Sequence, residues 1–340
     1  MMKVTEEDRL IVIASPHIRD AESIPKVMWT VVGALAPAGI VGVFMFGYYC
    51  LWIIFLCVAT TVIIEAVCQK LRGRSVTIND GSAVITGLLL AYTLPPGVPI
   101  YIPIIGAAFG IIVVKHTFGG LGNNIWNPAL AARAFLQIAY PTSMNSGWLN
   151  FKQTDFLQDT KSANLIGEQI VDAVTGATPL AKETSRKVYD YLDLFLGNVP
   201  GCIGEVSAIA IILGGLYLIY KGYVNWRVPS GFIGTVFILS RVLPPSIKAP
   251  WANDPLYHIL AGGLMLGAFF MATDMVTTPL THKGLIIFGI GCGLFTVLIR
   301  FYGGYPEGVC YSILLMNTVT PLIDRYTQPK LLGTSKRKRI

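Results

Sequence analysis

Charged residues are scarce in this sequence. Asp, Glu, Lys and Arg make up 13% of its 340 residues, about half the share found in soluble domains, while 53% of the residues are hydrophobic and the mean hydropathy is +0.60. A chain of this size with so few charges does not have the surface of an ordinary soluble protein. The composition therefore predicts an integral membrane protein.

Motifs for metals and nucleotides are also missing. The six cysteines contain no Cys-x-x-Cys pair and the four histidines are scattered, so neither a zinc site nor a protein-only iron–sulfur site is indicated. The sequence has no Gly-x-x-x-x-Gly-Lys-Ser/Thr loop, which gives no case for ATP-driven transport. It also has no Gly-x-Gly-x-x-Gly after a strand, which argues against NAD binding in a Rossmann fold.

The net charge of +7 does not indicate a nucleic-acid partner. The basic residues lie between apolar segments and in a cluster at 336–339, where they set the orientation in the bilayer and contact anionic lipid. The expected partner of this charge is the lipid bilayer, and no nucleic acid is expected.

Ten apolar segments follow one another along the chain. The longer ones cover about 27–46, 48–68, 203–220, 256–273, 284–300 and 308–323, and the shorter ones about 82–94, 99–114, 126–140 and 229–243. The short segments fall below the roughly 20 residues of a perpendicular span, so we expect half-helices or interior helices surrounded by protein. With the N-terminus inside, 17 of the 26 Lys and Arg residues lie on the cytoplasmic side, which places residues 141–202 outside the cytoplasm.

The two halves of the chain resemble each other. Residues 87–93 and 267–273 both begin with Gly and end with Thr, and an odd number of spans in each half makes the halves inverted. We therefore predict an all-α integral membrane protein of about ten transmembrane helices, arranged as two inverted five-helix repeats. The predicted domains are a cytoplasmic segment 1–26, the first repeat 27–140, an extracytoplasmic loop domain 141–202, the second repeat 203–323 and a basic cytoplasmic tail 324–340.

The long polar loop contains the first candidate site, the run Asp172-Ala-Val-Thr-Gly-Ala-Thr. The hydroxyls of Thr175 and Thr178 flank Gly176 and Ala177, so a bulky group can approach the backbone there. Asp172 could bind a metal-phosphate or cap a turn. The plain alternative is a capped surface turn, which the same residue types commonly form.

A second candidate lies at residues 118–128, where three glycines and three asparagines precede the arginine Arg133. The glycines permit close backbone approach, and the asparagine amides suit a flat heteroaromatic ligand. Arg133 is expected to face the interior of the bundle because a lipid-facing arginine is costly. The alternative is a tight re-entrant turn whose amides bond only to backbone groups.

Acidic residues in or beside the apolar segments form a third candidate. Glu65 and Asp274 stand near the cytoplasmic ends of their segments. Acids at such positions mark ion paths, or they are simply hydrated at a helix end. The sequence leaves both interpretations open.

Four motifs together resemble one known family. The run 172–181 is similar to the flavinylation motif of the D subunit of the Rnf electron-transport complex and of the B subunit of the sodium-translocating NADH:quinone reductase. The runs 119–129, 272–279 and 302–308 are similar to the same two proteins, in the same order, over essentially the whole chain. Because the first apolar segment begins by about residue 27, the resemblance is closer to the short form, the Rnf protein.

This resemblance implies that FMN is joined through its phosphate to the hydroxyl of Thr178, by a flavin transferase that uses FAD and magnesium. Thr175, Gly176, Ala177 and Asp172 then form the recognition frame of that threonine. The resemblance also implies a second, non-covalent flavin (riboflavin or FMN) in the membrane region, for which the surroundings of Asn124, Asn127 and Arg133 are the candidate.

The function implied by the family is that of a membrane component of an ion-translocating ferredoxin:NAD+ oxidoreductase, a redox-driven translocase of the inner (plasma) membrane. Its FMN would relay electrons coupled to Na+ or H+ movement, with Rnf subunits C, G, A, E and B as partners. No complete reaction is expected from this chain alone. The alternatives are a non-redox channel or secondary transporter for a small solute, for which inverted repeats are also suitable, and a structural scaffold.

Overall fold

Helices form all the regular structure in the part of the chain that the computed structural model describes, which is residues 22–146, 179–180, 189–205, 207–245, 251–304 and 307–329. In the first half these are α1 (Ile24–Phe46), α2 (Tyr48–Leu71), η2 (Ile78–Asp80), α3 (Ser82–Tyr92), α4 (Tyr101–Phe109), η3 (Gly110–His116), α5 (Pro128–Ala139) and α6 (Pro141–Ser146). In the second half they are α8 (Tyr191–Leu196), α9 (Ala208–Tyr220), α10 (Arg227–Val242), α11 (Pro255–Leu260), α12 (Leu264–Leu266), η6 (Gly267–Met271), α13 (His282–Tyr302) and α14 (Val309–Thr327). The all-helical fold class is confirmed over these residues.

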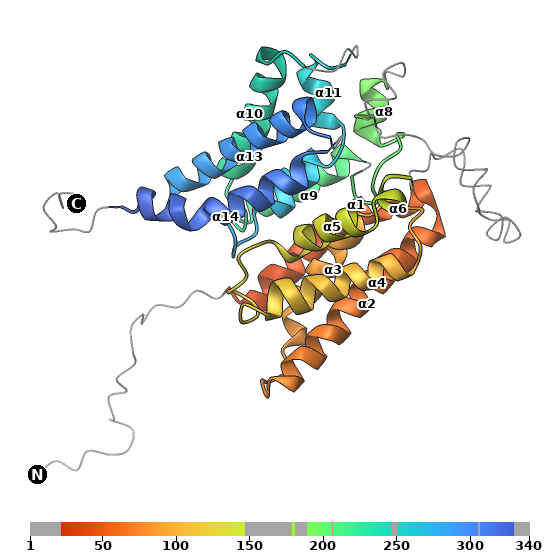
Figure 1. Ribbon diagram of the computed structural model, residues 1–340, viewed down its shortest axis with the longest axis vertical. Helices are drawn as coiled ribbons and strands as arrows, with labels where there is room; N and C mark the ends of the chain where they lie inside the picture. The colour runs from red at the N-terminus through yellow and green to blue at the C-terminus, as the bar shows by residue number, and fades with distance from the viewer. Residues whose placement is uncertain are drawn as a thin grey trace, which may run out of the picture.

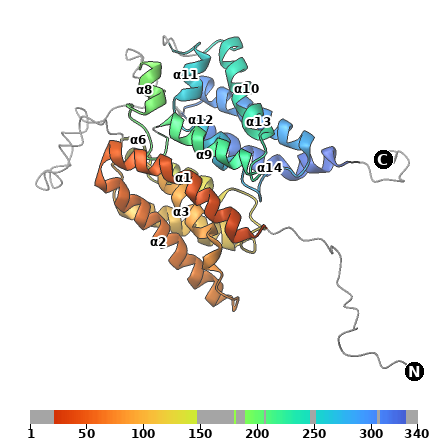
Figure 2. The same cartoon turned by 180° about the vertical axis from the view of Figure 1, so that it is seen from behind.

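The two halves form two neighbouring groups of helices. Figure 1 shows α2 to α6 in red to yellow on one side and α9, α10, α13 and α14 in green to blue on the other, with α8 and α11 at one end. Seen from behind in Figure 2, α1 lies along the boundary between the groups, beside α9. Buried side chains from both halves belong to one apolar core, so the halves pack as a single body.

Helices in the structure overlap all ten apolar segments of the sequence. The segment at 99–114 is α4, continued by the π-helical turn η3. The segment at 256–273 is divided into α11, α12 and the π-helical turn η6. Its first break falls at Gly262, whose φ of 71° is one that glycine adopts without strain.

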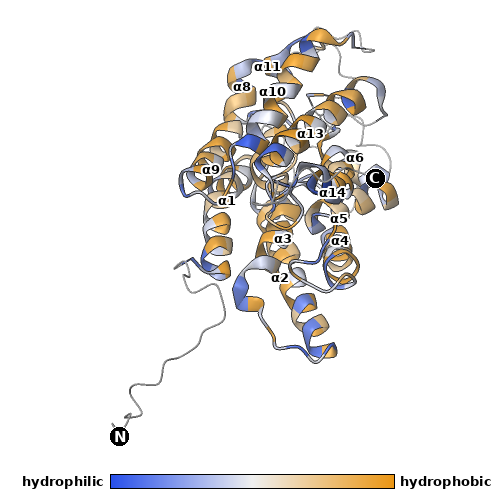
Figure 3. Ribbon diagram, turned by 90° about the vertical axis from the view of Figure 1, so that its left-hand side faces the viewer, coloured by the Kyte–Doolittle hydropathy of each residue, from blue (hydrophilic) through white to orange (hydrophobic). Residues whose placement is uncertain are grey.

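The outer surface of the helices is strongly apolar. Among the described residues, α1, α2 and α13 are long and apolar enough to cross a bilayer, and α3, α9 and the α4–η3 helix are shorter apolar helices. Ile40 and Phe44 of α1 are 69% and 77% exposed, which lipid tolerates and water does not favour. Figure 3 shows this apolar character along the length of the helices. The protein is a helical membrane protein.

Small residues allow the two halves to approach closely. A Cβ at Gly42 of α1 would lie 2.1 Å from the backbone oxygen of Ile203, and a Cβ at Gly214 of α9 would lie 2.1 Å from the backbone oxygen of Ala34. Both positions therefore accept only glycine without a shift of the backbone. Such close backbone packing is typical of helices that associate in a membrane.

Candidate functional site

The five residues of the predicted flavin motif, Asp172, Thr175, Gly176, Ala177 and Thr178, lie outside the described residues. Their predicted roles therefore stay predictions. The two residues that follow the motif, Pro179 and Leu180, are described, and they show where the motif joins the membrane part of the protein.

Pro179 and Leu180 are held against the second half. The hydroxyl of Tyr257, in α11, donates a hydrogen bond to the backbone oxygen of Pro179 at 3.1 Å. Leu180 is only 3% exposed and packs in a small apolar cluster with Leu194, Trp251, Tyr257 and Ala261. We call this set the anchor cluster. It fixes the chain one residue after Thr178.

The anchor cluster is tied together by α8 and α11. The rings of Trp251 and Tyr257 stack with their centroids 5.4 Å apart. Asp254 caps the first turn of α11 by accepting from the backbone N–H groups of Leu256 and Tyr257, and its carboxylate also accepts a hydrogen bond from the hydroxyl of Tyr191 in α8. Donation to Asp254 raises the pKa of Tyr191.

Below the anchor cluster lies a buried ionic cluster centred on Arg133 of α5. The Nη1 of Arg133 donates to Glu205 Oε1 at 3.0 Å, and its Nη2 donates to the carboxylate of Glu307. All three residues are less than 10% exposed. The prediction that Arg133 faces the interior is confirmed, because these two acids are its partners.

Glu205 is positioned by a segment that docks on the end of α3. The N–H of Ile203 donates to the oxygen of Leu94 at 3.1 Å, and the N–H of Gly204 donates to the oxygen of Tyr92 at 3.0 Å. A Cβ at Gly204 would lie 2.3 Å from the Cβ of Tyr92, so the segment approaches α3 as closely as it does only because this residue is glycine. No pattern in the sequence singled out Glu205.

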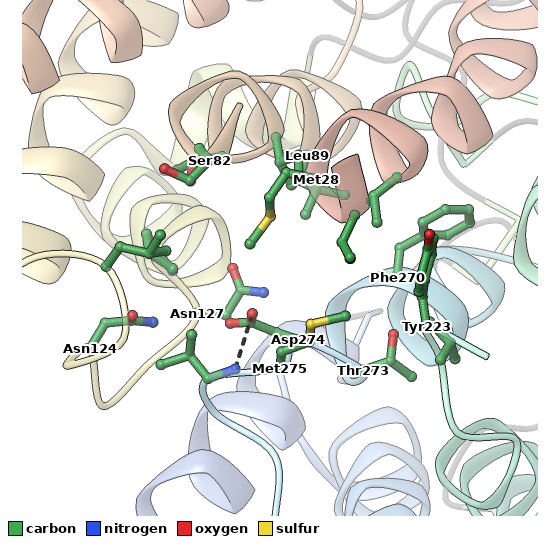
Figure 4. Close-up of a pocket in the computed structure, with 18 of the residues that line it drawn as sticks. Met28, Ser82, Leu89, Asn124, Asn127, Tyr223, Phe270, Thr273, Asp274 and Met275 are labelled. Atoms are coloured by element: carbon green, nitrogen blue, oxygen red, sulfur yellow. Dashed lines mark hydrogen bonds between the residues drawn. The ribbon is translucent and has the colours of Figure 1, made fainter. Parts of the chain in front are cut away.

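A pocket lies between the two halves at the start of α5. Residues of both halves line it, and part of it is open to the exterior. In Figure 4, Met28, Leu89 and Phe270 supply apolar walls, and the side chains of Asn127 and Asp274 extend toward each other across the centre. The pocket thus combines apolar walls with a few converging polar groups.

Asn127 joins this pocket to both halves. Its Oδ1 accepts from the N–H groups of Ala129 and Leu130, so it caps α5, and Pro128 at the first helical position is suited to that start. Its Nδ2 donates to the backbone oxygen of Met271 at the end of η6, 3.3 Å away. The asparagine therefore links the start of a first-half helix to the end of a second-half helix.

Lys115 forms a second buried ionic cluster beside the pocket. Its Nζ lies 2.6 and 2.8 Å from the two carboxylate oxygens of Glu65 and 2.8 Å from Ser82 Oγ, and both charged residues are 2% exposed. This burial excludes the interpretation in which Glu65 is a hydrated acid at a helix end. Lys115 and Ser82 also line the pocket.

The structure thus separates residues that stand close together in the sequence. Asn124 and Asn127 line the pocket, whereas Arg133 belongs to the buried cluster with Glu205 and Glu307. Asp274 lines the pocket too, half-buried, with its carboxylate bonded to Thr277 and to the N–H of Val276.

Three charged residues of these clusters were not predicted as site residues. Lys115 and Glu205 carry no local signal that could have found them, because their partners lie far away in the sequence. Glu307 stands in the 302–308 run that resembles the family, and this run was the one signal that could have found it.

The apolar helices, the buried ionic clusters and the pocket between the halves define the class of this protein, a polytopic helical membrane protein with charged groups in its interior. Sequence comparison identifies the family. The sequence model of the NQR2, RnfD, RnfE family matches residues 11–333. The chain belongs to this family, which confirms the resemblance seen in its motifs.

Named relatives match along nearly their whole length. The D subunit of the proton-translocating ferredoxin:NAD(+) oxidoreductase complex of Clostridium ljungdahlii is 47% identical over 334 residues, 95% of this chain and 96% of the relative. The D subunit of the Na(+)-translocating ferredoxin:NAD(+) oxidoreductase complex of Acetobacterium woodii is 47% identical over 338 residues, 98% of each chain. The D subunit of the ion-translocating oxidoreductase complex of Halorhodospira halophila is 36% identical over 343 residues, 95% of this chain and 96% of the relative.

Proposed function

We propose that this chain is the D subunit of an ion-translocating ferredoxin:NAD+ oxidoreductase complex and that it carries FMN on Thr178. The observation that carries the proposal is the match to D-subunit relatives over nearly the whole of both chains, together with the motif that precedes Pro179. A flavin relays one or two electrons, and the protein supplies its position and tunes its potential. The chain would relay electrons within a redox-driven translocase.

The anchor cluster supports this role for the loop. A phosphoester at Thr178 leaves the flavin ring unmodified at the end of a ribityl arm. The protein chain beside Thr178 must therefore be held in place to keep the ring near its electron partners. The hydrogen bond from Tyr257 to Pro179 and the burial of Leu180 hold the chain at the next two residues. In the proposed maturation, the hydroxyl of Thr178 attacks the FMN phosphate of FAD, AMP leaves, and the hydroxyl proton is released.

We further propose that the pocket between the halves takes the second, non-covalent flavin. Its apolar walls from Leu89 and Phe270 suit the faces of a flat heteroaromatic ring. Asn124 and Asn127 also line it, with their amides bonded to backbone groups. Lys115, which forms an ion pair with Glu65, also lines the pocket.

The proposed setting is the inner (plasma) membrane, with both termini in the cytoplasm and residues 141–202 outside. Ten spans in two inverted five-helix repeats fit the helices that overlap the ten apolar segments. The proposed partners are Rnf subunits C, G, A, E and B and, during maturation, the flavin transferase. The coupled ion is Na+ or H+, because two relatives of equal identity are named for different ions.

The test uses the full-length chain produced together with the flavin transferase. Wild type should carry one FMN by intact mass and show flavin fluorescence on a denaturing gel. Thr178→Ala should lose both signals, whereas the matched control Thr178→Ser keeps a hydroxyl and should retain them at least in part. Absence of covalent flavin from wild type, or its persistence in Thr178→Ala, would refute the assignment.

A second measurement concerns the pocket. Non-covalent flavin is released by denaturation from the Thr178→Ala chain, which lacks the covalent group. The amount released should fall when Asn127→Leu is added, because the leucine side chain fills the pocket. Solute uptake by the flavin-free chain in liposomes would instead favour the channel or transporter alternative.

A further inference from the structure

The ionic cluster below Pro179 contains two acids for one directly bonded base. Arg133 bonds to both Glu205 and Glu307, with one guanidinium nitrogen to each. The next base, Arg300 of α13, bonds to the backbone oxygens of His258 and Ala261 in the last turn of α11 rather than to a carboxylate. Two carboxylates in a buried site repel each other unless one of them is protonated.

One carboxylate oxygen in this cluster has no partner. Glu205 Oε2 makes no hydrogen bond to any described residue, although the side chain of Glu205 is only 3% exposed. An ionised oxygen left without a donor in such a place is strongly unfavourable, because the charge has lost its hydration without gaining a hydrogen bond. A carboxylic acid O–H at this atom would instead be free to donate to the neighbouring acid.

A small cavity adjoins this cluster. It has room for about one water molecule and is lined by Pro179, Val199, Pro200, Gly201, Glu205, Leu260, Gly262 and Glu307. Among the described residues that line it, the two acids are the only titratable ones, and Pro179, the residue that follows Thr178, also lines it. The two carboxyl groups give a water molecule in this cavity hydrogen-bond partners.

A cation is a poor alternative occupant. Ligand atoms of Cys202, Glu205 and Glu307 lie within 4.8 Å of one another, a spacing that a metal ion could use. However, the Arg133 guanidinium already bonds to both carboxylates and would repel a cation beside it. The Sγ of Cys202 donates to the backbone oxygen of Thr93 at 3.0 Å, so this sulfur is a thiol and not a thiolate ligand.

We propose that Glu205 and Glu307 together bind one exchangeable proton, held between their carboxyl groups on the Arg133 guanidinium and exchanged with outer water through the cavity under Pro179. The proton adds to a carboxylate oxygen as the pH falls and returns to water as it rises. The charged and titratable groups around the pair are Arg133 from α5, Arg300 from α13, His258 from α11, Cys202, and Cys310 from α14, whose thiol donates to the oxygen of Leu130.

This site has a consequence that rests on the proposed function. A flavin on Thr178 gains negative charge when a partner subunit reduces it, and a nearby negative charge makes proton binding by the acid pair more favourable. Uptake of one proton from outer water would then balance part of the charge on the flavin, and reoxidation would release that proton.

Infrared difference spectra of the full-length chain, recorded between high and low pH, test the proton directly. Wild type should show the carbonyl stretch of a protonated carboxylic acid, shifted in 2H2O, and the Glu205→Gln/Glu307→Gln double variant should lack it. Glu65→Gln is the matched control, since it alters a buried acid that has a base of its own, and it should retain the band. A wild type without the band, or a double variant that keeps it, would overturn the proposal.

Thermal stability gives an independent test that allows for misfolding. Glutamine mimics a protonated acid, so Glu205→Gln should unfold within a few degrees of wild type, while the double variant leaves Arg133 without a counter-ion and should unfold much earlier. If Glu205→Gln is as damaging as the double variant, both acids are ionised and the shared proton is ruled out.

The link to the flavin has its own readout in the flavin-loaded chain. The midpoint potential of the covalent flavin should change with pH over the range in which the infrared band titrates, and Glu205→Gln should reduce this dependence. If Glu205→Gln leaves the pH dependence of the midpoint potential unchanged, the coupling between the flavin and the acid pair is contradicted. The infrared band would still support the proton site. Absence of flavin from wild type would instead contradict the proposed function and leave the infrared result intact.

Discussion

Loosening the anchor cluster provides a quantitative test of how the segment after Thr178 is held. Leu180→Ala removes three carbons from a side chain that is 3% exposed. At about 0.8 kcal/mol per buried CH2 the transfer loss alone is about 2.4 kcal/mol, and the remaining cavity brings the range for such substitutions to about 2–5 kcal/mol. Tyr257→Phe removes only the donor to the Pro179 oxygen, which costs about 1 kcal/mol.

Hydrogen exchange measured by mass spectrometry can report this loss locally. Peptides from α8 and α11 should lose protection strongly in Leu180→Ala and weakly in Tyr257→Phe, because both helices contribute side chains to the cluster. Leu192→Ala is the matched control, since Leu192 lies on α8 but is 66% exposed. The reasoning fails if Leu192→Ala weakens protection as much as Leu180→Ala, or if Leu180→Ala leaves protection unchanged.

Three further predictions concern the packing of the halves and the pocket. Gly42→Ala places a methyl 2.1 Å from a backbone oxygen of the other half and should destabilise the protein by about 1–3 kcal/mol. Gly33→Ala, on the same helix with no atom within 4 Å, should have little effect. Thermal unfolding compares the two variants, and equal effects would contradict the close approach. Lys115→Met leaves Glu65 buried without its cation and should lower the free energy of unfolding by about 3–5 kcal/mol. Adding Glu65→Gln should restore much of this stability, and a double variant no more stable than the single one would show that the ion pair is not the cause. Asn127→Ala removes the cap of α5 and the hydrogen bond to the other half, so the free energy of unfolding should fall by about 0.5–2 kcal/mol. The content of non-covalent flavin should also fall, and an unchanged content would argue against the pocket as the flavin site.

Much of the helical structure could be predicted from local sequence. Long apolar runs require helices in a bilayer because every backbone polar group must be bonded within its own segment. At Asn127 and Pro128 the sequence suggested a ligand site or a tight turn, and the structure shows instead that this pair caps and starts α5. The helix ends were less predictable. The segment at 256–273 is broken into three pieces, which its apolar composition does not reveal.

Composition and residues close together in the chain were enough to predict the all-helical membrane class, the family, the inward position of Arg133 and the candidate flavin threonine. Which charges meet could be seen only in the folded protein. Arg133 pairs with acids 72 and 174 positions away, and Lys115 pairs with Glu65 across 50 positions. Such pairings depend on how the helices pack, since a buried charge takes the partner that the fold brings within reach, and no local pattern in the sequence specifies that partner.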